Sequence, residues 1–172
     1  MSPVWKLGLL LLFVAFLPAA RPAPERLKSE SKVIEQPSAP VKILSYESAY
    51  QAGAGAYVRE GIRHALDYQN ISTKSTVAVQ FGLVSFDVWN EFLDRTAGVD
   101  IETILPQAMS KGTWVASRYA DFSFHTGVAY VSKVRFEDGQ IWQADLDAIL
   151  SELRKIESDF DAAHLKKRDE SK

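Results

Sequence analysis

The chain has 172 residues, with 20 Lys and Arg against 22 Asp and Glu, a formal net charge of −2, and no cysteine. This balance argues against nucleic-acid binding, which requires clustered positive charge. The missing cysteine excludes disulfides, thiolate metal sites, cysteine nucleophiles and a lipid-modified cysteine.

Residues 1–23 have the composition of a secretory signal peptide. Lys6 precedes the apolar run Leu7–Leu17, and small residues follow as far as Ala23. Because the run is too short for a stable bilayer anchor, we expect cleavage after Ala20 or Ala23 and export to a secreted, periplasmic or other extracytoplasmic location. A retained N-terminal anchor is the alternative, and we expect no membrane span after cleavage.

Residues 24–40 are rich in charged residues and proline and contain few apolar residues. Such a segment buries too little surface to offset the entropy of ordering it, so it is predicted to be a flexible linker. The folded part is predicted to begin at Val41 and to form a β-sandwich over residues 41–144.

Alternation of apolar and polar residues predicts the first strands at Val41–Tyr46 and Tyr57–Tyr68. The clearest period-two pattern lies in Val77–Leu83, and the apolar phase then slips by one residue at Val84. A slip turns every later side chain to the other face of a sheet. It therefore predicts either a β-bulge near Leu83 and Val84, which we favour, or a strand with both faces covered.

Asn90–Lys111 loses the alternation and is predicted to be a long connection with a helical turn at Val99–Ile104. Later strands are predicted at Thr113–Ser117, Tyr119–Phe124 and Val128–Phe136. Asp138 and Gly139 then give a strong hairpin signal before a return strand at Trp142. The predicted sandwich core consists of Val77, Val79, Phe81, Phe86, Val131, Val134 and Phe136.

The period changes to that of a helix at Asp145. One apolar stripe is formed by Leu146, Ile149, Leu150, Leu153, Ile156 and Phe160. It predicts an amphipathic helix of about five turns over residues 145–165, with Asp145 as its N-cap and a charged tail at 166–172. The apolar face could cover its own sheet or dock on another chain.

The stretch from Tyr68 to Asp87, YQNISTKSTVAVQFGLVSFD, resembles secreted immunoglobulin-like domains of the FxLYD kind. In that family an Asn/Ser turn precedes an alternating strand that ends in an aromatic residue and Asp, as Phe86 and Asp87 do here. Leu83 stands where the family has Phe, and Ser85 departs from its Leu. The resemblance implies an immunoglobulin-like antiparallel β-sandwich that acts as an exported binding or spacer module, without catalytic residues.

The histidines offer only unspecific pairs. His64 with Asp67, and Asp121 with His125, lack the spacing of a metal or acid–base motif, and His164 suits the C-terminal pole of a helix. We therefore interpret them as ordinary surface or half-buried histidines. We expect no cofactor, and an enzyme is less favoured than a non-enzymatic protein.

Two further groups could carry function. Weak calcium or glycosidase candidates cluster in the predicted connection at Glu91, Asp94, Asp100 and Glu102. The second group consists of Trp89, Trp114 and Trp142. If exposed, these rings could stack on sugars or anchor a protein partner, but we favour their burial in the sandwich. In addition, Asn70-Ile71-Ser72 matches the N-glycosylation acceptor in a predicted turn.

The sequence as a whole predicts a mainly β protein with a C-terminal helix that serves as an exported, non-enzymatic binding or structural module. Its partner would be a protein or a glycan rather than nucleic acid. A carbohydrate-binding domain that uses the surface tryptophans is the first alternative. A hydrolase that uses the acidic residues 91–102 is the second.

Overall fold

A computed structural model describes residues 27–53, 59–116 and 123–165. The predicted signal peptide, the charged tail and most of the predicted strand Tyr119–Phe124 lie outside these ranges. Within them no helix is long and apolar enough to cross a bilayer.

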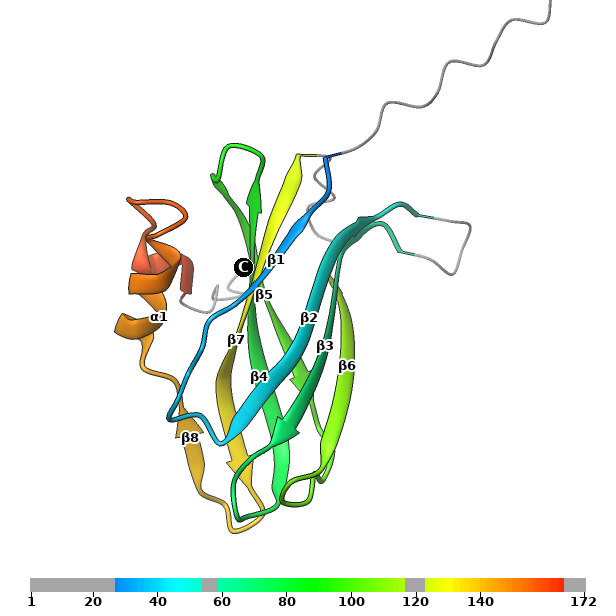
Figure 1. The fold of residues 1–172 in the computed structure, drawn as a ribbon, viewed down its shortest axis with the longest axis vertical. Coiled ribbons are helices and arrows are strands. Elements are labelled where there is room, and N and C mark those ends of the chain that lie inside the picture. Colours follow the sequence, from blue (N-terminus) through cyan, green and yellow to red (C-terminus); the bar gives the residue numbers. More distant parts are fainter. Residues whose placement is uncertain (1–26, 54–58, 117–122, 166–172) are drawn as a thin grey trace, which may run out of the picture.

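The described residues form two β-sheets and a C-terminal helical segment (Figure 1). The strands are β1 (Glu30–Val33), β2 (Val41–Gln51), β3 (Gly61–Asn70), β4 (Thr76–Asp87), β5 (Phe92–Asp100), β6 (Met109–Ala116), β7 (Phe124–Phe136) and β8 (Ile141–Gln143). One sheet has the order β1-β7-β4-β5, with β8 also paired to β7, and the other has the order β2-β3-β6. Neighbouring strands are antiparallel except β1, which runs parallel to β7.

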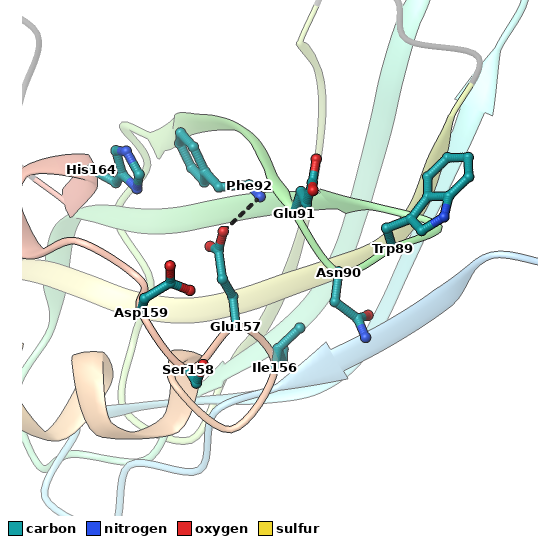
Figure 2. Close-up of a pocket in the computed structure, with 9 residues that line it drawn as sticks. All are labelled: Trp89, Asn90, Glu91, Phe92, Ile156, Glu157, Ser158, Asp159 and His164. Atoms are coloured by element: carbon teal, nitrogen blue, oxygen red, sulfur yellow. Dashed lines mark hydrogen bonds between the residues drawn. The ribbon is translucent and has the colours of Figure 1, made fainter.

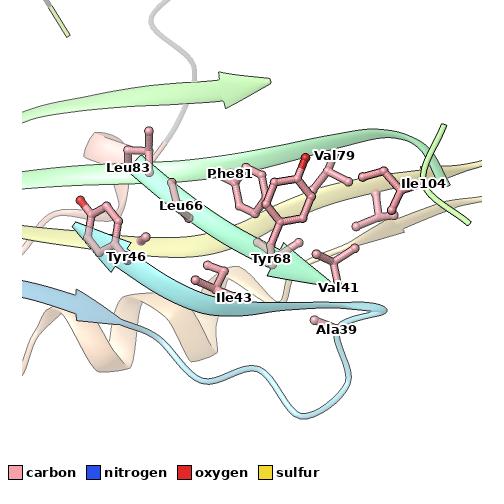
Figure 3. Packing of buried hydrophobic residues seen from close by; sticks show 13 residues of the cluster. Ala39, Val41, Ile43, Tyr46, Leu66, Tyr68, Val79, Phe81, Leu83 and Ile104 are labelled. Atoms are coloured by element: carbon pink, nitrogen blue, oxygen red, sulfur yellow. The ribbon is translucent and has the colours of Figure 1, made fainter. Parts of the chain in front are cut away.

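The two sheets face each other across a shared core (Figure 3). We call this cluster the sandwich core; its large members are Val41, Ile43, Tyr46, Leu66, Tyr68, Val79, Phe81, Leu83, Val131 and Val134. The prediction of a mainly β protein with two sheets is therefore confirmed. Of the predicted core residues, Val77 and Phe136 are only half-buried, and the others are buried.

A second cluster, the helix-side core, lies on the opposite face of β4 and β7. It joins these strands to the C-terminal segment through Ile34, Val84, Phe86, Val128, Tyr130, Ile149, Leu150, Leu153, Phe160 and Leu165. Figure 1 shows the helix α1 on one side of β4 and β7, and the sheet β2-β3-β6 on their other side. The central sheet is thus covered on both faces.

This arrangement explains the phase slip in β4. Leu83 faces the sandwich core and Val84 faces the helix-side core, so both are fully buried. The register of β4 against β7 shifts at Thr76/Ala78, Gln80/Phe81 and Phe86/Asp87, and its register against β5 shifts at Ser85/Phe86. Neither register shifts at Leu83/Val84. The favoured prediction of a bulge near Leu83 and Val84 was wrong, because the strand has two apolar faces instead.

The C-terminal helix begins as predicted but is much shorter. Asp145 is the N-cap of α1 (Leu146–Leu153), and its side chain accepts hydrogen bonds from the N–H groups of Asp147 and Ala148. The chain continues through turns to a short 3₁₀ helix, η1 (Ala162–Leu165). The prediction of a continuous helix over residues 145–165 was therefore wrong. Most of its apolar stripe, Ile149, Leu150, Leu153 and Phe160, is buried against the chain's own sheet, whereas Leu146 is exposed, so the stripe as a whole is not an open docking face.

Part of the predicted linker is folded. Within residues 24–40, β1 pairs with β7, and Ile34 is buried in the helix-side core. Gln36 donates a hydrogen bond to the carbonyl of Val131 (2.9 Å) and accepts one from its N–H (2.7 Å). The prediction of a flexible linker was wrong for this stretch, because backbone pairing orders a segment with few apolar side chains.

The predicted connection Asn90–Lys111 contains a strand. β5 pairs along most of β4, β6 begins at Met109, and the expected helical turn at Val99–Ile104 does not form. The hairpin prediction is confirmed, because Gly139 has a φ of +86° between β7 and β8.

Candidate functional site

An open cleft of about 530 Å³ lies between the turn that joins β4 to β5 and the segment that follows α1 (Figure 2). We call it the Trp89 cleft. Its lining consists of Trp89, Asn90, Glu91, Phe92, Ile156, Glu157, Ser158, Asp159 and His164. The cleft therefore brings together two segments that are more than sixty residues apart in the chain.

The turn on one side of the cleft is held rigidly by Asp87. This side chain is buried, and its Oδ1 accepts hydrogen bonds from the N–H groups of Trp89 (2.8 Å) and Glu91 (2.9 Å). Asn90 adopts a positive φ of 66°, a conformation that Asn tolerates better than most residues. The turn presents Trp89 to solvent with 73% of its surface exposed. The backbone of the turn is thus fixed, and the Trp89 ring projects from it into solvent.

The opposite wall is anchored by aromatic packing. Phe160 is fully buried, with its ring 5.8 Å from that of Phe86 and 5.5 Å from that of Phe92. The His164 ring stacks on Phe92 at 4.1 Å between centroids, and Glu157 Oε1 accepts the N–H of Phe92 at 3.4 Å. The C-terminal segment and β5 therefore form one packed unit.

The cleft carries negative charge, and its described lining residues include no Lys or Arg. Its carboxylates are those of Glu91, Glu157 and Asp159, and none of them forms an ion pair within the described residues. Glu157 Oε2 and His164 Nδ1 are buried beneath the cleft surface and have no hydrogen-bond partner in this part of the chain. The cleft thus offers a concave, acidic surface with two unsatisfied polar atoms just below it.

The structure does not bring the three predicted tryptophans together. Trp114 lies against Gly98 and Gly112, where an added Cβ atom would come within 2.8 and 2.1 Å of the indole. Its Nε1 donates to a backbone carbonyl of β5, so the ring covers the edge between β5 and β6. Trp142 is half-buried and packs against both cores. Only Trp89 of these three presents its ring to solvent.

The predicted acidic set is also not assembled. Glu91 precedes and Asp100 ends the nine-residue strand β5, which places them about 30 Å apart. Glycosidase carboxylates lie within about 10 Å of each other. The described residues contain no group of three or more His, Cys, Asp or Glu that could hold a metal ion. Glu91, Asp94, Asp100 and Glu102 are therefore not gathered at one point, and Glu91 and Asp100 are too far apart to act together as a glycosidase pair.

At the far end of β5, Asp100 has a structural role. Its carboxylate accepts a hydrogen bond from the Tyr68 hydroxyl, whose ring packs edge-on against Phe81 in the sandwich core. Burial, together with this carboxylate, raises the pKa of Tyr68 above its ordinary value. Tyr68 therefore stays a neutral hydrogen-bond donor.

The histidine pairs are resolved differently. His64 is fully buried, and its Nδ1 lies 2.7 Å from the Tyr46 hydroxyl, while Asp67 accepts a bond from Ser45 instead. Burial lowers the pKa of His64 to about 4. His125 bonds the neighbouring Thr126, and Asp121 lies outside the described residues. The interpretation as surface or half-buried histidines holds for His125 and His164 and was wrong for His64, which lies in the interior.

Three lining residues, Glu157, Asp159 and His164, were missed because they come from a segment that was predicted as continuous helix. In such a helix Asp159 would lie on the polar face, whereas Glu157 and His164 follow Leu153 and Phe160 by four residues and would interrupt the apolar stripe. Ser158 and Asp159 favour non-helical backbone through local hydrogen bonds, and this was the available signal for a break.

Asn70 of the N-glycosylation motif is buried in the structure. The side chain is fully buried, and its Nδ2 donates to the carbonyls of Lys74 (2.8 Å) and Ile104 (2.9 Å). Its Oδ1 accepts from the N–H and hydroxyl of Ser72. A glycan on Nδ2 would remove one of these donors and would have no path to solvent.

We accordingly expect folded protein from a glycosylating secretory host to carry no glycan at Asn70. Intact mass, measured before and after treatment with peptide N-glycosidase, should be unchanged and should equal that of the polypeptide. Ser72→Ala, which removes the acceptor motif and keeps Asn70, is the control and should behave identically. A glycan on Asn70 in a cooperatively folding fraction would contradict the burial of this side chain.

Comparison with known proteins gives a likeness of fold. A hypothetical protein from Peptoclostridium difficile 630 superposes with a TM-score of 0.50 at 9% identity, over 70% of this chain and 93% of that one. A Northeast Structural Genomics Consortium target gives a TM-score of 0.39 at 14% identity, over 61% of this chain and 80% of its own. No family model and no curated protein matches the sequence. The first likeness indicates a shared fold and says nothing of activity.

Proposed function

We propose that the chain is an exported, immunoglobulin-like domain that binds a partner protein at the Trp89 cleft and catalyses no reaction. The observation that carries this proposal is the 73% exposed Trp89, on a turn whose backbone is held by Asp87, at the rim of a cleft whose carboxylates form no ion pair within the described residues. Exposed tryptophan beside a concave polar surface is typical of the anchor residues that dominate protein–protein interfaces.

The strand order supports the immunoglobulin-like assignment. An immunoglobulin sandwich places strands A, B and E in one sheet and strands C, F and G in the other, and C′ can extend the second sheet. Here β2-β3-β6 would correspond to A-B-E, and β5-β4-β7-β8 to C′-C-F-G. The additional parallel strand β1 and the helix α1 depart from that plan. Export rests on the composition of residues 1–23.

Removing the Trp89 ring is expected to abolish partner binding without harming the fold. Trp89→Ala should weaken the affinity for the natural partner about thirty-fold or more, the loss typical of an aromatic residue that becomes buried at the centre of an interface. Because the turn is held by Asp87 and by the backbone, the unfolding midpoint should stay unchanged. The affinity of the partner, isolated on immobilised full-length protein and then purified, is measured by calorimetry.

The matched control is Ile141→Ala, which removes an exposed apolar side chain from β8, outside the cleft. It should leave the affinity unchanged. A partner that binds both variants as tightly as the unaltered chain would place the interface elsewhere and would contradict the proposal.

Carbohydrate binding is the second candidate, favoured by the same exposed ring with Asn90 and Glu91 beside it, since aromatic faces stack on sugars and amide or carboxylate groups bond hydroxyls. A titration of tryptophan fluorescence with a glycan panel tests it. A saturable change that disappears in Trp89→Ala would support this candidate over a protein partner, and an unchanged spectrum throughout would remove it.

A further inference from the structure

We infer that the Trp89 cleft selects a basic segment of a partner protein, one that carries at least two separated Lys or Arg side chains. This inference rests on the proposed binding role of the cleft and adds the chemical class of its ligand. It is argued from the charge of the lining, its unsatisfied atoms, the spacing of its carboxylates and the exposed Trp89.

The sign of the ligand charge follows from the lining. Glu91 lies on the β4–β5 turn, and Glu157 and Asp159 lie on the facing segment, so negative charge occupies both walls. Among the described residues, no Lys or Arg lines the cleft. A concave surface with one sign of charge concentrates the electrostatic field and attracts the opposite charge. An acidic ligand would be repelled from both walls.

The unsatisfied polar atoms point to a hydrogen-bond donor. Glu157 Oε1 already accepts the N–H of Phe92, whereas Oε2 is buried with no partner in the described chain. A carboxylate oxygen in this position is costly to leave unbonded. Because Oε2 has almost no exposed surface, a ligand reaches it only when the Glu157 side chain turns toward the cleft. An ammonium or guanidinium group then supplies both the donor and the compensating charge, and such charge-assisted bonds are stronger than neutral ones.

The spacing of the carboxylates favours several charges over a single ion. The described residues contain no group of three or more His, Cys, Asp or Glu that could hold one metal ion. Figure 2 shows Glu91, Glu157 and Asp159 spread along the cleft rather than directed at one centre. A chain with positive groups on successive side chains matches this spread, and one small cation does not.

Trp89 supplies the remaining contact. The ring is exposed at the rim of the cleft, next to Glu91. Guanidinium and ammonium groups bind above an indole face, and the long aliphatic stems of Arg and Lys pack on apolar surface while their charged ends reach carboxylates. Because guanidinium is planar and stacks well, we expect Arg to bind more tightly than Lys at this position.

The test is a calorimetric titration of the full chain with three blocked peptides of equal length, in which Gly alternates with Arg, Gln or Glu. The Arg peptide should bind, and the Gln and Glu peptides should bind at least about ten-fold more weakly. Raising NaCl from about 50 to about 300 mM should weaken the Arg peptide further. Equal affinity for the Arg and Gln peptides would overturn the inference.

The decisive variant is Glu91→Gln with Glu157→Gln, which removes two charges and keeps an amide oxygen to accept the Phe92 N–H. We expect about a ten-fold or greater loss of affinity for the Arg peptide. Glu47→Gln with Glu137→Gln removes two exposed charges outside the cleft and should have little effect. Equal losses in the two variants would show non-specific attraction and would overturn the inference.

Two further arms separate the possible failures. Spermine carries separated ammonium groups without a peptide; binding at least as tight as that of the Arg peptide would overturn the assignment to a protein segment. If a neutral glycan or peptide binds through Trp89 and the Arg peptide does not, the inference of a basic ligand is overturned. The proposal that the Trp89 cleft is a binding site would stand. If the purified natural partner keeps its full affinity for Trp89→Ala, the proposed function itself fails.

Discussion

Replacement of Phe160 by alanine is expected to lower the free energy of unfolding by about 3–5 kcal/mol, the usual cost of removing a buried aromatic ring. Phe160 is fully buried and packs against Phe86, Phe92 and His164. It is also the residue that holds the segment after α1 against β4 and β5. The expected loss thus includes local detachment of that segment, and with it one wall of the Trp89 cleft.

Urea unfolding measures the change in free energy, and amide hydrogen exchange over residues 154–165 reports the local detachment. The control is Leu146→Ala, which lies in the same apolar stripe but is 41% exposed, so its cost should be small. If Phe160→Ala lowers the free energy of unfolding no more than Leu146→Ala does, the C-terminal segment is not part of the core. Its apolar stripe would then again be a candidate docking face for another chain.

Acidification from pH 6.5 to pH 4 is expected to cost about 3 kcal/mol of stability through His64 alone, at about 1.4 kcal/mol for each pH unit. Burial lowers the pKa of His64 from 6.5 to about 4 in the folded chain. Above pH 6.5 the imidazole is neutral in both states and stability does not change. Between pH 6.5 and 4, His64 is protonated in the unfolded chain but remains neutral in the folded chain. The free energy of unfolding therefore falls as the pH falls.

The sharpest comparison pairs the unaltered chain with the double variant Tyr46→Phe and His64→Phe. His64 Nδ1 bonds the Tyr46 hydroxyl, and replacing both partners by apolar rings leaves no buried polar group of this pair unsatisfied. Urea unfolding at pH 7 and pH 5 should show a smaller loss in the variant, and the difference is the His64 contribution. Parallel losses in both proteins would contradict a neutral buried imidazole.

Local signals in the sequence predicted local structure well. The Asp138-Gly139 hairpin and the Asp145 N-cap both depend on a few adjacent residues, and both are present. The strands β2 and β4 were found because one or both of their faces are apolar. In β4 the phase slip was seen correctly but explained wrongly, because covering by α1 on the second face is a tertiary fact that periodicity cannot reveal.

Edge strands were missed for a related reason. β1 and β5 lie at the two ends of their sheet, and their order comes from backbone pairing with β7 and β4. Most of the β1 side chains are exposed and those of β5 are mixed, so neither strand shows clear alternation. The helix was overextended because Ile156 and Phe160 keep helical spacing although the chain turns after Leu153.

The candidate site was predictable only in part. Trp89 was named from its residue type and its place near a strand end, but nothing in the sequence distinguished it from Trp114 and Trp142, whose rings cover glycines or pack between the two cores. The facing wall, with Glu157 and His164, depends on how the segment after α1 folds back. Such a juxtaposition belongs to the tertiary structure.

The parallel pairing of β1 with β7 also bears on how the domain responds to mechanical load. Tension applied through residues that precede Glu30 would pull β1 along its own axis past β7, in shear. Its four residues and the hydroxyl bonds from Ser29 and Ser31 to Ser48 would then resist together, rather than opening one after another as in a peeled hairpin. The domain is therefore expected to resist tension applied at β1 more strongly than a hairpin that opens one bond at a time.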